Sequence, residues 1–312
     1  MTITQLQYVL AVAEYQNFTL AAEKCFVTQP TLSMQIQKIE EELGILIFDR
    51  TKKPIQLTEI GHKIVDQAKK IVNESGRIKD IVDQQKGFIG GEFRLGIIPT
   101  VMPTLLPMFL TNFIKKYPKV QLIIEELNTD EMIIRLINGH LDAAIAATPL
   151  SEEKIKEVVL YYEPFVAYIP ENNSNYSKED IGVSDLNPDD ILLLRDGHCF
   201  RESVLNLCKI GTADNKKFRI ESGSFETLIK LADEGLGTTL LPYLHTIDLK
   251  EKDKAKLRNF KEPKPAREIS LIFLKTELKM HIIEALRNTI AGVIRGAVVF
   301  HNVEIVSPLP KK

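Results

Sequence analysis

The stretch VTQPTLSMQIQKIEEELG, residues 27–44, constrains the fold of this chain most strongly. Thr28 can cap a helix, Pro30 suits its first turn, and Gly44 can end it. An apolar residue recurs every three or four positions, which keeps one helix face toward a core, at Leu32, Ile36, Ile39 and Leu43. This stretch therefore predicts one helix with a defined beginning and end.

Two shorter helices are predicted before it, over residues 4–15 and 20–25, and a tight turn separates the second from the third. The segment that follows, ILIFDRTKKPIQLT, is β-prone on both sides of a basic tip at Arg50, Lys52 and Lys53. A short helix, a turn, a longer helix and a β-hairpin predict a winged helix-turn-helix over residues 1–58.

Residues 59–87 predict one long polar helix that carries a narrow apolar stripe. Such a stripe indicates a partner helix, so we expect this linker to dimerise; the alternative is that it packs on its own domain. Gly87, Gly90 and Gly91 then predict a hinge.

Residues 88–312 alternate between strand and helix patterns, which predicts an α/β regulatory domain with a mostly parallel sheet. Two lobes are expected, 88–162 plus 268–296 and 163–267, with a cleft between them. Ligands of such folds bind beyond the carboxyl ends of the strands. The expected strands are 92–98, 120–127, 143–147, 164–169, 191–194, 238–241 and 268–274, and the expected helices include 103–117 and 130–138.

The composition excludes several classes of protein. No run approaches the roughly 18 apolar residues that a membrane span needs, so we expect a cytoplasmic protein that does not enter membranes. Three cysteines without metal-ligand spacing argue against a secreted disulfide scaffold and a zinc site, and we expect neither metal nor cofactor.

Short polar side chains near the start of the third helix suit the reading of base edges in a DNA groove. The wing cations Arg50, Lys52 and Lys53 suit phosphate contacts. Residues 1–87 hold eleven Lys or Arg and eleven Asp or Glu, so non-specific affinity should be modest and salt-sensitive. The alternative is a three-helix domain that binds protein. The candidate DNA contacts on the helix are Thr28, Gln29, Thr31, Ser33 and Gln35.

The segment RDGHCFRESVLNLC, residues 195–208, predicts a helix with Cys199 at its start and Cys208 at its end. Free N–H groups at a helix N-terminus lower a thiol pKa, so Cys199 is expected to be reactive. An intact helix separates the two by about 13.5 Å on opposite faces, whereas a disulfide needs Cα atoms within roughly 7 Å. Oxidation would therefore have to unwind the helix; the alternative is two incidental cysteines. Cys25, in the winged domain, is expected to be structural.

The stretch FTLAAEKCFVTQPTLSMQIQKIEEELGILIFDR closely resembles the winged helix of LysR-type transcriptional regulators, and LADEGLGTTLLP at 231–242 resembles their effector-domain signature. The resemblance implies a periplasmic-binding-protein-like regulatory domain, a third helix in the major groove of promoter DNA, a dimerising linker, homodimers that pair into homotetramers, and contact with RNA polymerase. It is not the pattern of an enzyme. It also implies base-reading positions at Gln29, Pro30, Thr31, Ser33 and Gln35, with Arg50 in the wing.

The run DGHCFRESVLNLC resembles the redox motif of the hydrogen-peroxide-sensing LysR regulators, with Phe200 for the usual Leu and Glu202 for the usual Asp. The resemblance implies that Cys199 is the peroxidatic thiol, that Cys208 resolves the sulfenic acid to a disulfide, and that glutaredoxin or thioredoxin reduces it. It further implies a peroxide pocket, although each threonine alone could be a helix cap. The pocket residues are Thr100, Thr129, His198, Arg201 and Arg267.

The preferred hypothesis is a peroxide-responsive activator of oxidative-stress genes, switched by a Cys199–Cys208 disulfide. A second hypothesis replaces the thiol switch with a small effector bound in the interlobe cleft. A third, a thiol peroxidase or solute-binding protein, conflicts with the winged helix.

Overall fold

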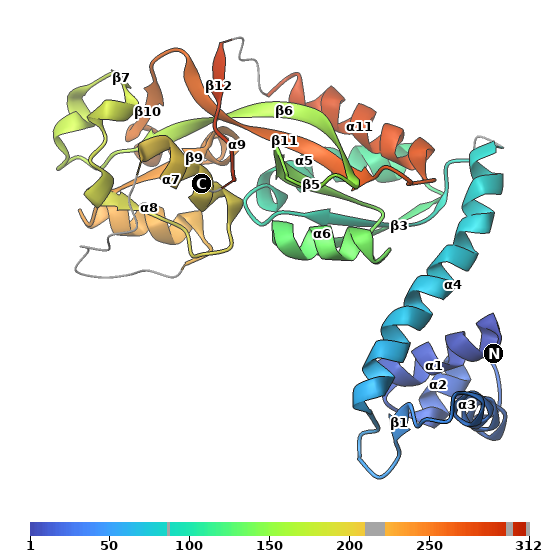
Figure 1. Cartoon of the computed structure of the whole chain (residues 1–312). Coiled ribbons are helices and arrows are strands. Elements are labelled where there is room, and N and C mark those ends of the chain that lie inside the picture. Colours follow the sequence, from blue (N-terminus) through green and yellow to red (C-terminus); the bar gives the residue numbers. More distant parts are fainter. Residues whose placement is uncertain (86–87, 210–221, 298–301, 310–312) are drawn as a thin grey trace. The chain divides into compact units, whose positions relative to one another are not determined.

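The computed structural model describes residues 1–85, 88–209, 222–297 and 302–309 (Figure 1). The chain forms two compact units, residues 1–87 and 88–312.

The N-terminal unit is a winged helix-turn-helix, as predicted. Helix α2 begins two residues earlier than expected because Asn17 caps it, accepting from the backbone N–H of Thr19 and Leu20. The wing strands pair antiparallel, with Phe48 opposite Leu57. The elements are α1 (Ile3–Tyr15), α2 (Phe18–Lys24), α3 (Gln29–Leu43), β1 (Phe48–Asp49), β2 (Gln56–Leu57) and α4 (Glu59–Gln85).

The linker helix α4 has two parts with different surroundings. Val65 and Ala68 in its first half are buried in the core of the N-terminal unit. In its second half Ile78 is 67% exposed and Ile81 is 51% exposed. The helix therefore packs on its own domain at one end and presents apolar side chains at the other.

The second unit is built on a mixed sheet of order β4-β3-β5-β11-β6-β10-β7. The expectation of a mostly parallel sheet is wrong: β3 pairs parallel with β4 and β5, but β11 runs antiparallel to both β5 and β6. Strand β11 comes late in the chain but lies between β5 and β6 in the sheet. The alternation of strands and helices in the sequence does not show its direction. The strands are β3 (Gly91–Ile97), β4 (Val120–Glu126), β5 (Ala143–Thr148), β6 (Ile155–Tyr168), β7 (Asp180–Ile181), β8 (Ile191–Leu192), β9 (Thr238–Pro242), β10 (Leu257–Phe260), β11 (Lys264–Leu274) and β12 (Val303–Ile305).

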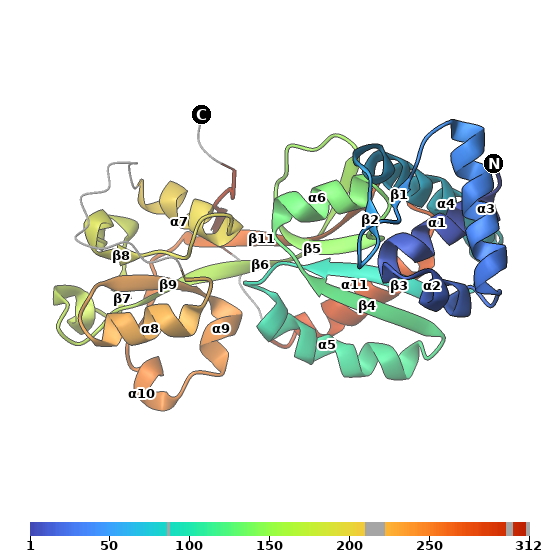
Figure 2. The ribbon, with the colours of Figure 1, turned by 90° about the horizontal axis from the view of Figure 1, so that it is seen from below.

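The described residues of this unit form two hydrophobic cores, and β6 contributes to both, with Tyr161 in the first and Phe165 in the second. Strands β6 and β11 run from one lobe into the other (Figure 2). In the first lobe α11 and α6 cover opposite sides of the sheet (Figure 1). The helices are α5 (Met102–Lys116), α6 (Thr129–Ile137), α7 (Cys199–Cys208), α8 (Phe225–Asp233), α9 (Tyr243–Ile247), α10 (Glu251–Lys254) and α11 (Met280–Ile294).

The β-prone tail forms β12, which pairs parallel with β11 at Lys264, Pro265 and Ala266. Among the residues that the structure describes, no helix combines the length and apolar character that crossing a membrane requires.

Candidate functional site

Helix α7 has the predicted relation to the two cysteines: Cys199 is its first residue and Cys208 its last. Both thiols are free. The intact helix places them about 13.5 Å apart along its axis and on opposite sides. A bond between the two sulfurs therefore requires α7 to unwind.

The thiol of Cys199 lies where the lobes meet. Phe200, the next residue of α7, is buried in the second core. Cys199 itself packs against the first core. The groups that stabilise its thiolate come from both lobes: Arg267, the hydroxyl of Thr129, and the backbone amides of Phe200 and Ala147.

The expectation of a lowered pKa for Cys199 is wrong in direction. Burial raises the pKa of the thiol, and this effect outweighs the opposing effects of Arg267, Thr129 and the two amides. The hydrogen bond from the Phe200 amide is the pKa-lowering effect predicted for the helix N-terminus. It is present but smaller than the desolvation that the interlobe position imposes.

Thr129 is not a helix cap. Asn128 caps α6 by accepting from the backbone N–H of Glu131 at 2.9 Å. The Thr129 hydroxyl is buried and has no oxygen or nitrogen partner among the described residues, and its neighbour is the Cys199 sulfur. A buried hydroxyl of this kind is the feature expected where a small polar ligand binds.

Arg267 is hydrogen-bonded to Thr100 and Glu163 on the other side of the site. Its Nη1 donates to Thr100 Oγ1 at 2.8 Å and its Nη2 to the Thr100 carbonyl at 3.1 Å. Its Nε and Nη2 donate to Glu163 Oε2 at 2.9 and 2.7 Å. The guanidinium also lies over the Phe200 ring, 5.1 Å from its centre. Arg267 and Thr129 act on the Cys199 thiol, and Thr100 is connected to it through Arg267. That these three residues form a peroxide pocket stays a prediction.

Sequence reasoning missed Glu163, which is 1% exposed. Its second oxygen, Oε1, accepts from the backbone N–H of Leu244 at 2.9 Å. The available signal was a single carboxylate within the apolar strand LYYEPFVAYI. Buried charges are paired, so such a residue indicates a buried cationic partner.

His198 and Arg201 have their contacts elsewhere. His198 Nε2 accepts from Arg195 Nε at 3.4 Å, and burial, followed by the charge of Arg195, lowers the pKa of His198. Arg201 Nε lies 2.8 Å from Asp196 Oδ1 and its Nη1 donates to the Leu194 carbonyl. The contacts of both side chains are with the loop that precedes α7, so their role in a peroxide pocket stays a prediction.

Cys208 is buried in the second core with Phe200, Val204 and Val306. Burial raises its pKa to about 12. The thiol must therefore leave the core before it can react as a thiolate.

The start of α3 presents the predicted DNA-contact residues. Thr28, Gln29 and Pro30 are exposed, while Thr31 and Ser33 are half-buried. Thr28 Oγ1 accepts from the Thr31 amide at 3.4 Å, which caps the helix. The Gln35 side chain is engaged within the protein, because its Oε1 accepts from Gln5 Nε2 at 3.1 Å. Lys52 and Lys53 are exposed in the turn between the wing strands.

Arg50 has contacts within the protein. Its Nη2 lies 2.8 Å from Oε2 of Glu40, and its guanidinium lies over the Phe18 ring at 5.1 Å. Glu40 is 4% exposed and also accepts from the amides of Ile47 and Phe48. Arg50 therefore fastens the wing to α3.

Comparison with known proteins matches both units. Residues 3–62 match the family model of bacterial regulatory helix-turn-helix proteins of the lysR family, and residues 86–294 match the LysR substrate binding domain. The Escherichia coli K12 "DNA-binding transcriptional dual regulator OxyR" is 35% identical over 274 residues, which are 88% of this chain and 89% of that protein.

Two solved structures are also similar. Full-length OxyR from Pseudomonas aeruginosa, as a cysteine-to-aspartate variant, matches with a TM-score of 0.73 and 33% identity, covering 93% of this chain and 98% of that one. A cysteine-to-serine variant of Corynebacterium glutamicum OxyR with hydrogen peroxide bound matches with a TM-score of 0.63 and 27% identity, covering 95% and 94%.

Proposed function

Because this chain belongs to the LysR family of DNA-binding transcriptional regulators, which are not enzymes, we propose that it is a peroxide-responsive activator of oxidative-stress genes. Its switch is an intramolecular disulfide between Cys199 and Cys208. The observation that carries this proposal is the Cys199 thiol beside the buried hydroxyl of Thr129, which has no oxygen or nitrogen partner among the described residues, at the junction of the lobes.

The chemistry of the site suits a small peroxide. The Cys199 thiolate attacks one oxygen of hydrogen peroxide, so that an S–O bond forms and the O–O bond breaks. The leaving hydroxide takes up a proton and departs as water. The sulfur is oxidised by two electrons to sulfenic acid, and the peroxide is reduced.

Five side chains assist this step. Arg267 stabilises the thiolate and the developing negative charge. The hydroxyls of Thr129 and Thr100 supply hydrogen-bonding groups for the peroxide oxygens, although Thr100 already accepts from Arg267. His198 and Arg201 hold the loop that leads into Cys199 through Arg195 and Asp196.

The second step converts oxidation into a change of conformation. The Cys208 thiolate attacks the sulfenic sulfur; the S–S bond forms, the S–O bond breaks, and the leaving hydroxide takes up a proton and departs as water. Because an intact α7 keeps the sulfurs apart, this step unwinds the helix, removes Cys199 from the first lobe and takes Cys208 out of the second core. Glutaredoxin or thioredoxin restores the thiols by returning two electrons.

The change in the regulatory domain then alters how the DNA-binding unit contacts DNA. Dimers form through the apolar residues of α4 and pair into tetramers, and re-forming the regulatory lobes alters which half-sites are occupied and how RNA polymerase is engaged. Gln29, Pro30, Thr31 and Ser33 read bases in the major groove, and Lys52 and Lys53 contact phosphate.

Thiol trapping with mass spectrometry tests this proposal on the full chain, before and after near-stoichiometric hydrogen peroxide. The expected product is a Cys199–Cys208 disulfide in the wild type and in Cys25→Ser, a stable sulfenic acid in Cys208→Ser, and no product in Cys199→Ser. Three free thiols in the oxidised wild type would contradict the proposal and favour control by an effector in the interlobe cleft.

A further inference from the structure

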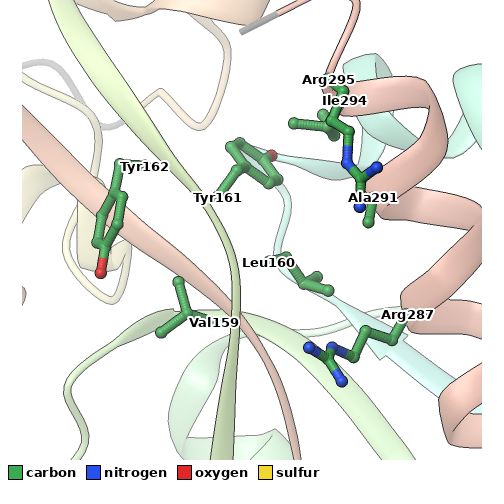
Figure 3. A pocket seen from close by; sticks show the side chains of 8 residues that line it. All are labelled: Val159, Leu160, Tyr161, Tyr162, Arg287, Ala291, Ile294 and Arg295. Carbon is green, nitrogen blue, oxygen red and sulfur yellow. The ribbon is translucent and has the colours of Figure 1, made fainter. Parts of the chain in front are cut away.

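A cavity of about 330 Å³ lies between β6 and α11, apart from the Cys199 site (Figure 3). A β-bulge lies beside it. The β6–β11 register shifts between Ile269 and Ser270, which face Tyr161 and Val159, so no residue of β11 pairs with Leu160. As a result Leu160 and Tyr161 both lie on the α11 side of β6, whereas Val159 and Tyr162 lie on the other (Figure 3).

The cavity has a buried polar group without a partner. Tyr161 is 6% exposed, and its hydroxyl makes no hydrogen bond with any residue that the structure describes. A buried hydroxyl left without a partner costs free energy, so a ligand atom that accepts from it would be stabilised there.

Two arginines complete the cavity, Arg287 on α11 and Arg295 directly after its last residue. Arg287 and Arg295 are exposed, and within the described parts of the chain neither makes a hydrogen bond or ion pair. They are separated by about 12 Å along the helix, with the small side chain of Ala291 between them. Leu160, Ala291 and Ile294 supply apolar walls between the two charges.

We propose that this cavity binds a small dicarboxylate, with one carboxylate at each arginine, its carbon chain against Leu160 and Ala291, and the Tyr161 hydroxyl donating to the carboxylate at Arg295. Guanidinium groups hold carboxylates through charge-assisted hydrogen bonds. Two cations separated by an apolar stretch select a ligand with charge at both ends over one with a single charge.

Isothermal titration calorimetry of the full reduced chain with adipate tests the proposal. We expect saturable binding to the wild type, roughly tenfold weaker or worse in Arg287→Gln with Arg295→Gln, and several-fold weaker in Tyr161→Phe. The matched control is Arg94→Gln, which removes an exposed arginine paired with Glu92 outside the cavity and should leave binding unchanged.

Hexanoate and inorganic phosphate are the comparison probes. Hexanoate should bind more weakly than adipate because it lacks the second carboxylate. No saturable heat with adipate, equal affinity in the double arginine variant, or phosphate bound as tightly as adipate would each overturn the proposal.

A second, independent observation concerns the tail. Asn206 Nδ2, on α7, donates to the carbonyls of Ser307 at 2.9 Å and Leu309 at 2.7 Å. The Val306 amide donates to the Ala266 carbonyl at 2.8 Å, and Val306 is buried in the same core as Cys208. The tail is therefore held by β11 on one side and holds α7 on the other.

We infer that residues 302–309 are a latch that retards the unwinding of α7; this inference rests on the proposed disulfide switch. Cys208 follows Asn206 by two residues, so Cys208 cannot reach Cys199 without disturbing the helix turn that the tail holds. Releasing the tail should accelerate the resolving step and leave the first oxidation step unchanged.

Rapid-mixing experiments with hydrogen peroxide separate the two steps, with dimedone trapping for sulfenic acid and mass spectrometry for the disulfide. In Asn206→Ala we expect unchanged sulfenic acid formation and disulfide formation several-fold faster than in the wild type. The control is Asn302→Ala, a tail residue whose side chain donates to Glu262 and not to α7.

The outcomes distinguish the latch from the switch. If the wild type forms no Cys199–Cys208 disulfide, the proposed function fails. If the disulfide forms in both proteins at the same rate, or more slowly in Asn206→Ala, the switch stands and the latch is wrong.

Discussion

Arg267 and Glu163 lie directly opposite each other on β11 and β6, and form an ion pair in which Nη2 is 2.7 Å from Oε2 and each side chain is 1% exposed. The second oxygen of Glu163 accepts from the Leu244 amide, and Arg267 also donates to the hydroxyl and the carbonyl of Thr100. Both strands run from one lobe into the other, so any movement of the lobes involves them. The ion pair therefore links the Cys199 site to the strands that connect the lobes.

Glu163→Gln is expected to lower the free energy of unfolding by about 3–5 kcal/mol, because it leaves the Arg267 charge buried without its counter-ion. Urea denaturation of the reduced protein measures this loss. The control is Glu92→Gln, which breaks an exposed pair with Arg94 and should cost about 1 kcal/mol or less. Equal small losses in the two variants would contradict the structural role given to the buried pair.

The reaction of Cys199 with peroxide should become faster as pH rises, by roughly tenfold per pH unit below its pKa, because only the thiolate reacts and burial raises that pKa. Thr129→Val removes a hydrogen bond that favours the thiolate, so the profile should move to higher pH and the rate at neutral pH should fall.

The pH dependence of Cys199 alkylation measures this shift. Thr289→Val is the matched control, since that hydroxyl donates to the Ala285 carbonyl within α11 at 2.8 Å. A Thr129→Val profile that coincides with the wild type would show that the hydroxyl does not act on the thiol.

Acid should destabilise the reduced protein partly through His198. Its pKa is lowered in the folded state by burial and Arg195, so below the ordinary pKa of about 6.5 the unfolded chain binds a proton that the folded chain does not. The stabilising contribution is present above that value and is lost as pH falls. His198→Gln should therefore show a smaller loss of unfolding free energy between about pH 7 and pH 5.

The pH series is made by urea denaturation of four proteins: the wild type, His198→Gln, His245→Gln and the double variant. Burial also lowers the pKa of His245, so each single variant should remove part of the slope and the double variant more. Slopes that are identical in all four proteins would be inconsistent with this linkage.

Gln29→Ala and Lys52→Ala should weaken DNA binding in different ways. Losing a base contact at Gln29 should cost about 1–3 kcal/mol and relax specificity at one base pair. Losing a phosphate contact at Lys52 should weaken binding to all sequences and reduce the slope of log affinity against log salt by about 1.

Fluorescence anisotropy over a series of salt concentrations, on DNA selected from a random pool by the wild type, measures both effects. Arg50→Gln provides the contrast. Because Arg50 is paired with Glu40, it should lower the stability of the N-terminal unit more than it changes the salt slope. A uniform loss from Gln29→Ala without altered specificity would contradict its assignment to base reading.

Local pattern was sufficient to predict the winged helix and the helix between the two cysteines. Their boundaries follow from short-range rules: Thr28 caps α3, Gly44 ends it with a φ of +65°, and α7 spans Cys199 to Cys208. Each rule acts over a few residues, so a single sequence contains the information it needs.

The arrangement around Cys199 is different, because it depends on residues far apart along the chain. Arg267 is 167 residues from Thr100 and 104 from Glu163, and the antiparallel entry of β11 between β5 and β6 brings them together. No periodicity specifies that entry, and the importance of Glu163 and the mixed sheet went unpredicted for the same reason.

The elements, the spacing of the two thiols and the resemblance to LysR regulators can all be read from the amino-acid sequence. The pKa values of those thiols, in contrast, depend on how the chain packs around them. Helix position alone predicts a lowered pKa for Cys199, but packing between two lobes raises it, because desolvation of a charge depends on everything that surrounds it and not on its neighbours in the chain.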